Sequence, residues 1–89
     1  MYILDEPEAA LSPNRQLAFL TRMHELIEQE SQFIIATHSP ILLSYPRAKI
    51  IQISEHGFEE VDYKNTQHYM LYKDFLVNPE YMLKKLRIN

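Results

Sequence analysis

The stretch MYILDEPEAALSP, residues 1–13, decides how the first part of this chain folds. Its first four residues form a continuous apolar run, which is typical of a short parallel strand that is buried on both faces. Two acids, Asp5 and Glu6, follow that run directly, and Pro7 then ends the strand. We therefore expect a buried strand whose carboxyl end carries two adjacent carboxylates.

The residues after this stretch predict a helix and then a second strand. Ser12 followed by Pro13 is typical of a helix start, because the hydroxyl caps the first turn and proline is tolerated at the first helical position. A second apolar run, residues 33–36, follows the helix, and strand, helix and strand in this order predict a parallel βαβ unit. The predicted helix extends to about Glu30, and its apolar half carries Leu17, Phe19, Leu20, Met23, Leu26 and Ile27.

The remainder of the chain predicts a short helix, a hairpin and two further helices. We expect residues 1–54 and 55–89 to be two parts of one α/β domain. The predicted elements are a helical turn from Pro40, strands over 48–54 and 58–63 joined by a turn at His56-Gly57, a helix from Thr66 to about Val77, and a last helix over 79–88 capped by Asn78.

The composition indicates one small globular domain. The chain has 89 residues, of which 46% are hydrophobic and 24% charged. A net charge of −3 argues against tight nonspecific nucleic-acid binding by this chain alone, although a larger assembly could still meet DNA. Zero cysteines exclude a disulfide framework and thiolate metal sites, and are compatible with the cytoplasm, where we expect the protein. No signal peptide or membrane span is predicted.

Polar side chains follow both predicted parallel strands at the point where each strand ends. Asp5 and Glu6 follow the first strand, and Thr37, His38 and Ser39 follow the second. Ligands collect at the carboxyl ends of parallel strands, and adjacent strand residues point in opposite directions. One carboxylate can therefore hold Mg²⁺ through water while the other activates an attacking water, with the histidine near a phosphate oxygen. The alternative is that the two acids only cap the strand and favour the next helix N-terminus.

Two quoted motifs resemble those of a known family. MYILDEPEAALSP resembles the Walker B strand and the following D-loop of ABC-type P-loop ATPases, and FIIATHSP, residues 33–40, resembles their H-loop strand. The two motifs occur in the family's order, separated by one helix, and the likeness covers roughly the first 55 residues. The tail, residues 65–83, resembles the C-terminal end of soluble bacterial ABC-like "AAA" ATPases. The resemblance implies a partial RecA-like parallel sheet that lacks the P-loop strand.

The resemblance also implies roles for individual residues. Asp5 corresponds to the Mg²⁺-associated aspartate, Glu6 to the catalytic base, and His38 to the switch histidine near the γ-phosphate of ATP. Transporter ATPases commonly have Thr where Glu8 stands and Asp at the end of the D-loop, so the likeness shifts toward soluble relatives such as chromosome-maintenance and recombination ATPases. The D-loop that faces a second ATPase head corresponds to Ala9, Ala10, Leu11 and Ser12.

These 89 residues do not contain the glycine-rich motifs that bind the phosphates in such a site. Gly57 is the single glycine, so neither G-x-x-x-x-G-K-[ST] nor the glycine-containing signature motif occurs. We therefore expect the C-terminal portion of a longer ATPase, inactive as this isolated chain. Its expected partners are the P-loop-bearing N-terminal portion and a second ATPase head in a homodimer. Without a neighbouring P-loop strand, we expect the chain to be marginally stable, oligomeric, or rearranged so that its second and third strands pair.

Two other functions fit parts of the pattern. The chain could be a non-catalytic remnant or interaction module that associates with a separate P-loop-bearing partner. A metal-dependent nuclease using Asp5 and Glu6 would need further acids at the same sheet edge, where only Glu8 is nearby.

Overall fold

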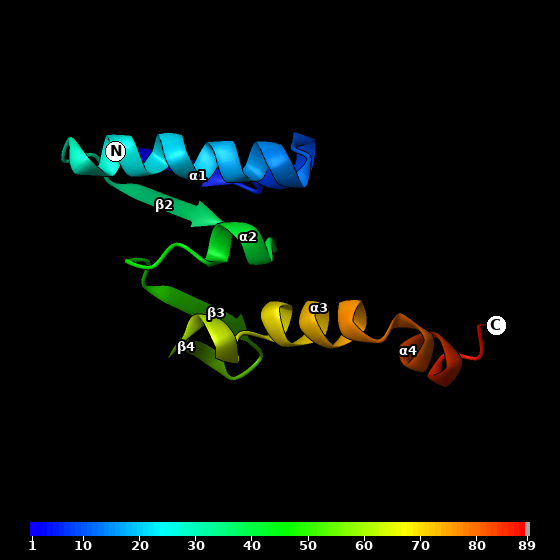
Figure 1. Ribbon diagram of the computed structural model, residues 1–89. Coiled ribbons are helices and arrows are strands. Elements are labelled where there is room, and N and C mark those ends of the chain that lie inside the picture. Colours follow the sequence, from blue (N-terminus) through cyan, green and yellow to red (C-terminus); the bar gives the residue numbers. More distant parts are fainter. Residues whose placement is uncertain (89) are drawn as a thin grey trace. The chain divides into compact units, whose positions relative to one another are not determined.

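The computed structural model describes residues 1–88, which fall into two compact units. Unit 1 covers residues 1–48 and unit 2 begins at Lys49, and each contains one two-stranded sheet (Figure 1). The third strand pairs with the fourth and belongs to unit 2, so the boundary between the two units falls between residues 48 and 49.

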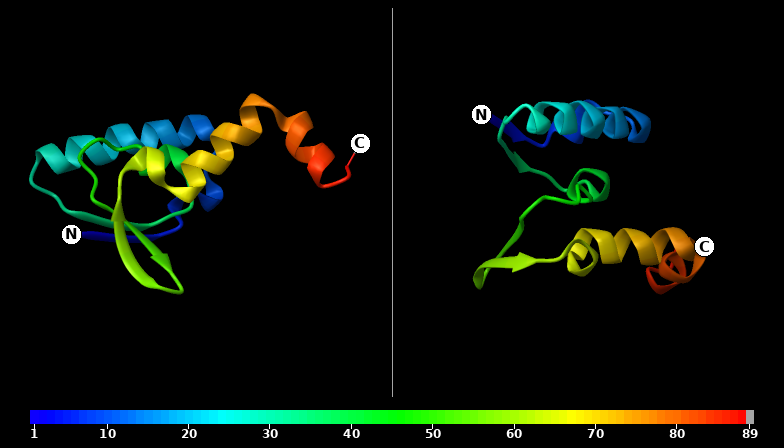
Figure 2. Two further views of the ribbon diagram at one scale, coloured as in Figure 1. Left: turned by 90° about the horizontal axis from the view of Figure 1, so that it is seen from below. Right: turned by 60° about the vertical axis from the view of Figure 1, so that its left-hand side comes forward.

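Unit 1 is a parallel βαβ unit followed by one short helix (Figures 1 and 2). The two strands pair in parallel, so their carboxyl ends meet at one edge of the sheet. The long helix that joins them lies along one face of that sheet (Figure 2). The predicted strand–helix–strand arrangement is confirmed. Its elements are β1 (Tyr2–Asp5), the 3₁₀ helix η1 (Pro7–Ala10), α1 (Pro13–Glu28), β2 (Phe33–Ala36) and α2 (Pro40–Leu43).

Both α-helices of unit 1 begin at a proline that follows a capping serine. The Ser12 hydroxyl accepts a hydrogen bond from the Arg15 backbone N–H at 3.3 Å, which confirms the predicted cap of α1. The Ser39 hydroxyl caps α2 in the same way. α1 ends at Glu28, two residues earlier than predicted, because Glu30 adopts a left-handed φ of 68° and turns the chain toward β2.

The sheet of unit 1 is buried on one face only, so the prediction that the first strand is buried on both faces was wrong. Leu4 and Ile35 pair across the two strands and are half-buried on one face. Ile3 and Ile34 pair with each other on the opposite face and are 74% and 52% exposed. A continuous apolar run is typical of strands that are covered on both faces, but within the described residues of unit 1 a helix covers only one face of the sheet.

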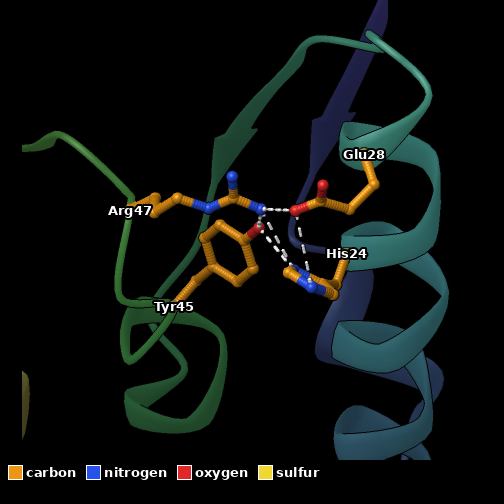
Figure 3. A network of polar contacts seen from close by, with 4 residues as sticks. All are labelled: His24, Glu28, Tyr45 and Arg47. Atoms are coloured by element: carbon orange, nitrogen blue, oxygen red, sulfur yellow. Dashed lines mark hydrogen bonds and ion pairs between the residues drawn. The ribbon is translucent and has the colours of Figure 1, made fainter.

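A polar network joins α1 to the segment after α2 (Figure 3). The Arg47 guanidinium donates to a Glu28 carboxylate oxygen at 2.6 Å, to the Tyr45 hydroxyl at 3.0 Å and toward His24 Nδ1 at 3.3 Å. His24 Nδ1 also lies 2.9 Å from the Tyr45 hydroxyl, so we assign it as an acceptor, with the imidazole proton on Nε2. Hydrogen bonds to Tyr45 and Glu28 raise the pKa of Arg47, which is therefore a permanent donor in this network.

Unit 2 is an antiparallel hairpin followed by helices. The hairpin and the helix caps at Thr66 and Asn78 are confirmed. The turn falls at residues 55–56, one position earlier than predicted, and Gly57 opens the second strand with a φ of 110°. The last helix ends at Lys85 rather than at residue 88. The elements are β3 (Ile50–Ser54), β4 (Gly57–Val61), the 3₁₀ helix η2 (Tyr63–Asn65), α3 (Gln67–Val77) and α4 (Pro79–Lys85).

The two sheets are separate in their strand pairing. Among the described residues, β2 pairs with β1 and β3 pairs with β4, so direct pairing of the second and third strands is not observed. In residues 1–88, no helix combines the length and apolar character needed to cross a membrane.

Candidate functional site

The two polar clusters predicted from the sequence lie at the same edge of the unit 1 sheet. Asp5 is the last residue of β1 and pairs with Ala36, the last residue of β2. The segment Thr37-His38-Ser39 follows β2 directly. Because the strands are parallel and in register, the side chains after both strands meet at their shared carboxyl end.

Glu6 turns sharply away from the strand and meets His38. Its backbone adopts a left-handed conformation, with φ 47° and ψ 56°, while its N–H still donates to the Ala36 carbonyl at 2.7 Å. A residue with a Cβ atom loses roughly 1–2 kcal/mol in this region. The turn places a Glu6 carboxylate oxygen 3.1 Å from His38 Nε2, and both side chains are accessible, at 52% and 70% exposed. The pair is therefore open to water and to a ligand.

Asp5, the neighbour of Glu6, takes no part in the ion pair between Glu6 and His38. Its side chain is exposed, and within residues 1–88 it forms no hydrogen bond or ion pair. The same described residues contain no group of three or more carboxylates or imidazoles that could hold a metal together. A single free carboxylate fits Mg²⁺, which keeps several of its waters and binds proteins through one or two carboxylates together with substrate phosphates.

Glu8 contributes a contact that the sequence analysis did not assign. One of its carboxylate oxygens accepts from the Thr37 hydroxyl at 2.7 Å, and the other accepts from the His38 backbone N–H at 2.9 Å. Burial alone raises the pKa of Glu8, but the hydrogen bonds from Thr37 and His38 outweigh burial and leave the pKa below its ordinary value. The available signal in the sequence was the departure from Thr at this position.

Ser39 fixes the turn after β2 to α1. It is 6% exposed, its hydroxyl donates to the Gln16 side-chain oxygen, and that hydroxyl accepts from the Leu42 N–H at 3.2 Å. The Gln16 amide in turn donates to the Leu11 carbonyl at 3.2 Å. The turn that carries His38 is thus connected to the segment between η1 and α1 through buried and half-buried polar atoms.

The four residues predicted to face a second ATPase head, Ala9 to Ser12, span the end of η1 and the segment that joins it to α1. Ala9 and Ala10 end η1 and are exposed, whereas Leu11 is half-buried in an extended conformation. Ser12 is exposed but its hydroxyl already caps α1. The two alanines therefore provide the more open part of this segment.

Comparisons with known proteins concern the same part of the chain. Residues 1–44 match the model of a family described as "AAA domain, putative AbiEii toxin, Type IV TA system". No curated protein and no solved structure matches the chain. The matched residues are just under half of the chain, and they contain β1, α1, β2 and α2 with all the side chains of this candidate site. The match supports a domain related to AAA-type P-loop ATPases, and the small parallel sheet with its helix is compatible with part of such a domain.

Proposed function

We propose that unit 1 is the Walker B and H-loop portion of an ATPase that binds and hydrolyses ATP with Mg²⁺ at an interface between two ATPase heads. The observation that carries this proposal is the 3.1 Å contact between Glu6 and His38. The two residues belong to different motifs and follow different strands, yet they meet at the sheet edge where α/β proteins bind ligands. The family match over residues 1–44 supports the same assignment.

Each residue has a task that fits its chemistry and surroundings. Glu6, a carboxylate open to solvent, accepts a proton from the attacking water. His38 donates its Nε2–H to an oxygen of the transferring phosphate, in exchange for its contact with Glu6. Asp5, whose carboxylate is exposed, would hold Mg²⁺ through water. The ion, when bound, neutralises charge on the phosphate oxygens.

The phosphates themselves are held by another segment. A glycine-rich loop supplies the backbone N–H groups that cradle them, and we propose that it comes from an N-terminal portion with the G-x-x-x-x-G-K-[ST] motif. The exposed isoleucines of the sheet, Ile3 and Ile34, support association with such a portion, because parallel sheets are usually covered on both faces. A second head would approach at Ala9 and Ala10.

Calorimetry with ATP and Mg²⁺ tests this function. We would titrate the 89-residue chain alone and mixed with the polypeptide encoded immediately upstream, and measure phosphate release in both. We expect binding and turnover only in the mixture. Glu6→Gln should retain ATP binding and lower turnover by roughly 10²–10⁴-fold, the contribution of a general base. Glu25→Gln, which removes one carboxylate from an exposed position of α1, is the matched control and should leave turnover unchanged.

Two results would overturn the proposal. Turnover that survives Glu6→Gln would remove the base from its assigned position. Tight binding of ATP by the 89-residue chain alone would mean that the phosphates are held elsewhere in these residues.

A non-catalytic interaction module is the second candidate. The observation that favours it is again the exposed apolar face at Ile3 and Ile34, since association with a partner needs such a surface whether or not chemistry follows. In that case the mixture would form a complex, and wild type and Glu6→Gln would show the same absence of turnover.

A further inference from the structure

A carboxylate outside the Glu6–His38 pair holds the turn that carries His38. Glu8 uses both carboxylate oxygens, one on the Thr37 hydroxyl at 2.7 Å and one on the His38 N–H at 2.9 Å. The Thr37 hydroxyl also accepts from the Ser39 N–H at 3.0 Å. One acid therefore organises three consecutive residues of this turn.

Glu8 and Glu6 belong to the same short, closed segment. The Glu6 carbonyl accepts from the Ala9 N–H at 3.1 Å, and the Glu8 carbonyl accepts from the Leu11 N–H at 2.9 Å. Pro7, which lies between the two acids, restricts the backbone further. Glu8 is only two residues from Glu6 in this closed segment. The hydrogen bonds from the turn after β2 to Glu8 therefore also hold that turn close to Glu6.

The ion pair between Glu6 and His38 is too exposed to hold the His38 side chain in place by itself. Both side chains are more than half exposed, and an exposed ion pair is screened by water and loses side-chain entropy when it forms. Two hydrogen bonds to a carboxylate, of which one involves a backbone N–H, are stronger and more directional. The position of the His38 backbone, and with it the reach of the imidazole, is thus set by Glu8.

We propose that Glu8 is a positioning residue that clamps the turn after β2 and so holds His38 within reach of Glu6. This inference rests on the proposed function for its catalytic meaning, whereas the clamp itself can be tested without ATP. Glu8 contacts the backbone of His38 and not its imidazole, so we assign it a positioning role and no direct part in the reaction.

The clamp predicts different results for three substitutions of Glu8. Glutamine keeps the length and one acceptor oxygen for the His38 N–H, and its amide can donate to the Thr37 hydroxyl, so Glu8→Gln should retain the clamp. Aspartate is one methylene shorter and should lose one of the two contacts. Alanine should lose both. If Glu8 acted only through its charge, Gln and Ala would be equivalent.

Nuclear magnetic resonance on the ¹⁵N-labelled 89-residue chain tests the clamp. In wild type, the His38 amide proton shift should follow the Glu8 titration, with a midpoint below the ordinary pKa of 4.5. Glu8→Gln should abolish that step and keep the amide protected from exchange. Glu8→Ala should raise the exchange rate of the His38 amide by about tenfold or more, because a hydrogen bond to a charged group is lost. Glu25→Gln is again the control and should leave this amide unchanged.

The outcomes separate the clamp from the proposed function. An unchanged His38 amide in Glu8→Ala, or equal effects of Gln and Ala, would overturn the clamp whether or not the chain belongs to an ATPase. In the mixture that hydrolyses ATP, we expect Glu8→Ala to lower turnover at least tenfold and Glu8→Gln to restore most of it. Wild-type turnover in Glu8→Ala, alongside loss in Glu6→Gln, would overturn the positioning role and leave the proposed function standing.

Discussion

Glu6 is the position at which substitutions can separate backbone geometry from carboxylate chemistry. Its left-handed backbone, with φ 47° and ψ 56°, costs roughly 1–2 kcal/mol for any residue that has a Cβ atom. Glycine avoids that cost but loses about 0.5–1 kcal/mol through its larger freedom in the unfolded chain. The difference predicts that Glu6→Gly is more stable than Glu6→Ala by about 1 kcal/mol.

The loss of the carboxylate itself should matter little for stability. The contact with His38 joins side chains that are 52% and 70% exposed, so solvent screening limits its contribution to about 0.5 kcal/mol. We therefore expect Glu6→Ala to lie slightly below wild type in free energy of unfolding, and Glu6→Gly to equal or exceed wild type. Neither variant should support turnover in the ATP-hydrolysing mixture, because both lack the base.

Urea unfolding is the assay, followed by the intensities of amide signals from β1 and β2 so that unit 1 is observed by itself. The matched control is the same pair of substitutions at Glu25, in the interior of α1. There the helical backbone reverses the order, and Gly should be less stable than Ala by about 1 kcal/mol. If Gly is also the less stable residue at position 6, the left-handed conformation of Glu6 and the strain inferred from it are refuted.

Three further predictions concern other parts of the chain. Ser39→Ala should lower the free energy of unfolding by about 2 kcal/mol, because it removes a helix cap and leaves buried polar atoms unpaired. Ser12→Ala removes an exposed cap and should lower it by about 1 kcal/mol or less, so equal losses in urea unfolding would contradict this reasoning. Because the pKa of Glu8 is lowered on folding, the contribution of its carboxylate to the free energy of unfolding is fully present above the ordinary pKa of 4.5 and is lost as the pH falls through the folded-state pKa. Unfolding curves measured from pH 6 to pH 3 should therefore show a loss of stability in wild type that Glu8→Gln lacks. Gly57→Ala should destabilise the hairpin of unit 2 by about 1 kcal/mol. There is space for a Cβ atom, since no atom lies within 4 Å of it, but the backbone φ of 110° is strained for any residue other than glycine. Unchanged exchange rates of the β3 and β4 amides would argue against that strain.

The sequence by itself determined the two strands and the two α-helices of unit 1 and their order. Short apolar runs predicted β1 and β2, and Ser12 followed by Pro13 predicted the start of α1, because these signals act over a few neighbouring residues. Parallel pairing followed from the strand–helix–strand order, and it brings the ends of both strands to one edge. The sequence therefore already predicted that the acids after β1 and the segment Thr37-His38-Ser39 after β2 would share one edge of the sheet.

The tertiary structure decided how those neighbours are held. The partners of Glu8, Thr37 and His38, lie in the turn after β2, far from Glu8 in the sequence. These contacts therefore depend on the strand register and on the left-handed turn at Glu6, and no local sequence pattern encodes either feature. The same holds for the network around Arg47, whose donors and acceptors come from α1 and from the segment after α2. Apolar runs also cannot reveal which face of a sheet is covered, because covering depends on where helices pack, and here α1 leaves Ile3 and Ile34 exposed. Hydrogen bonds and burial between distant residues exist only once the chain is packed, and that is why the clamp on His38 emerged from the fold alone.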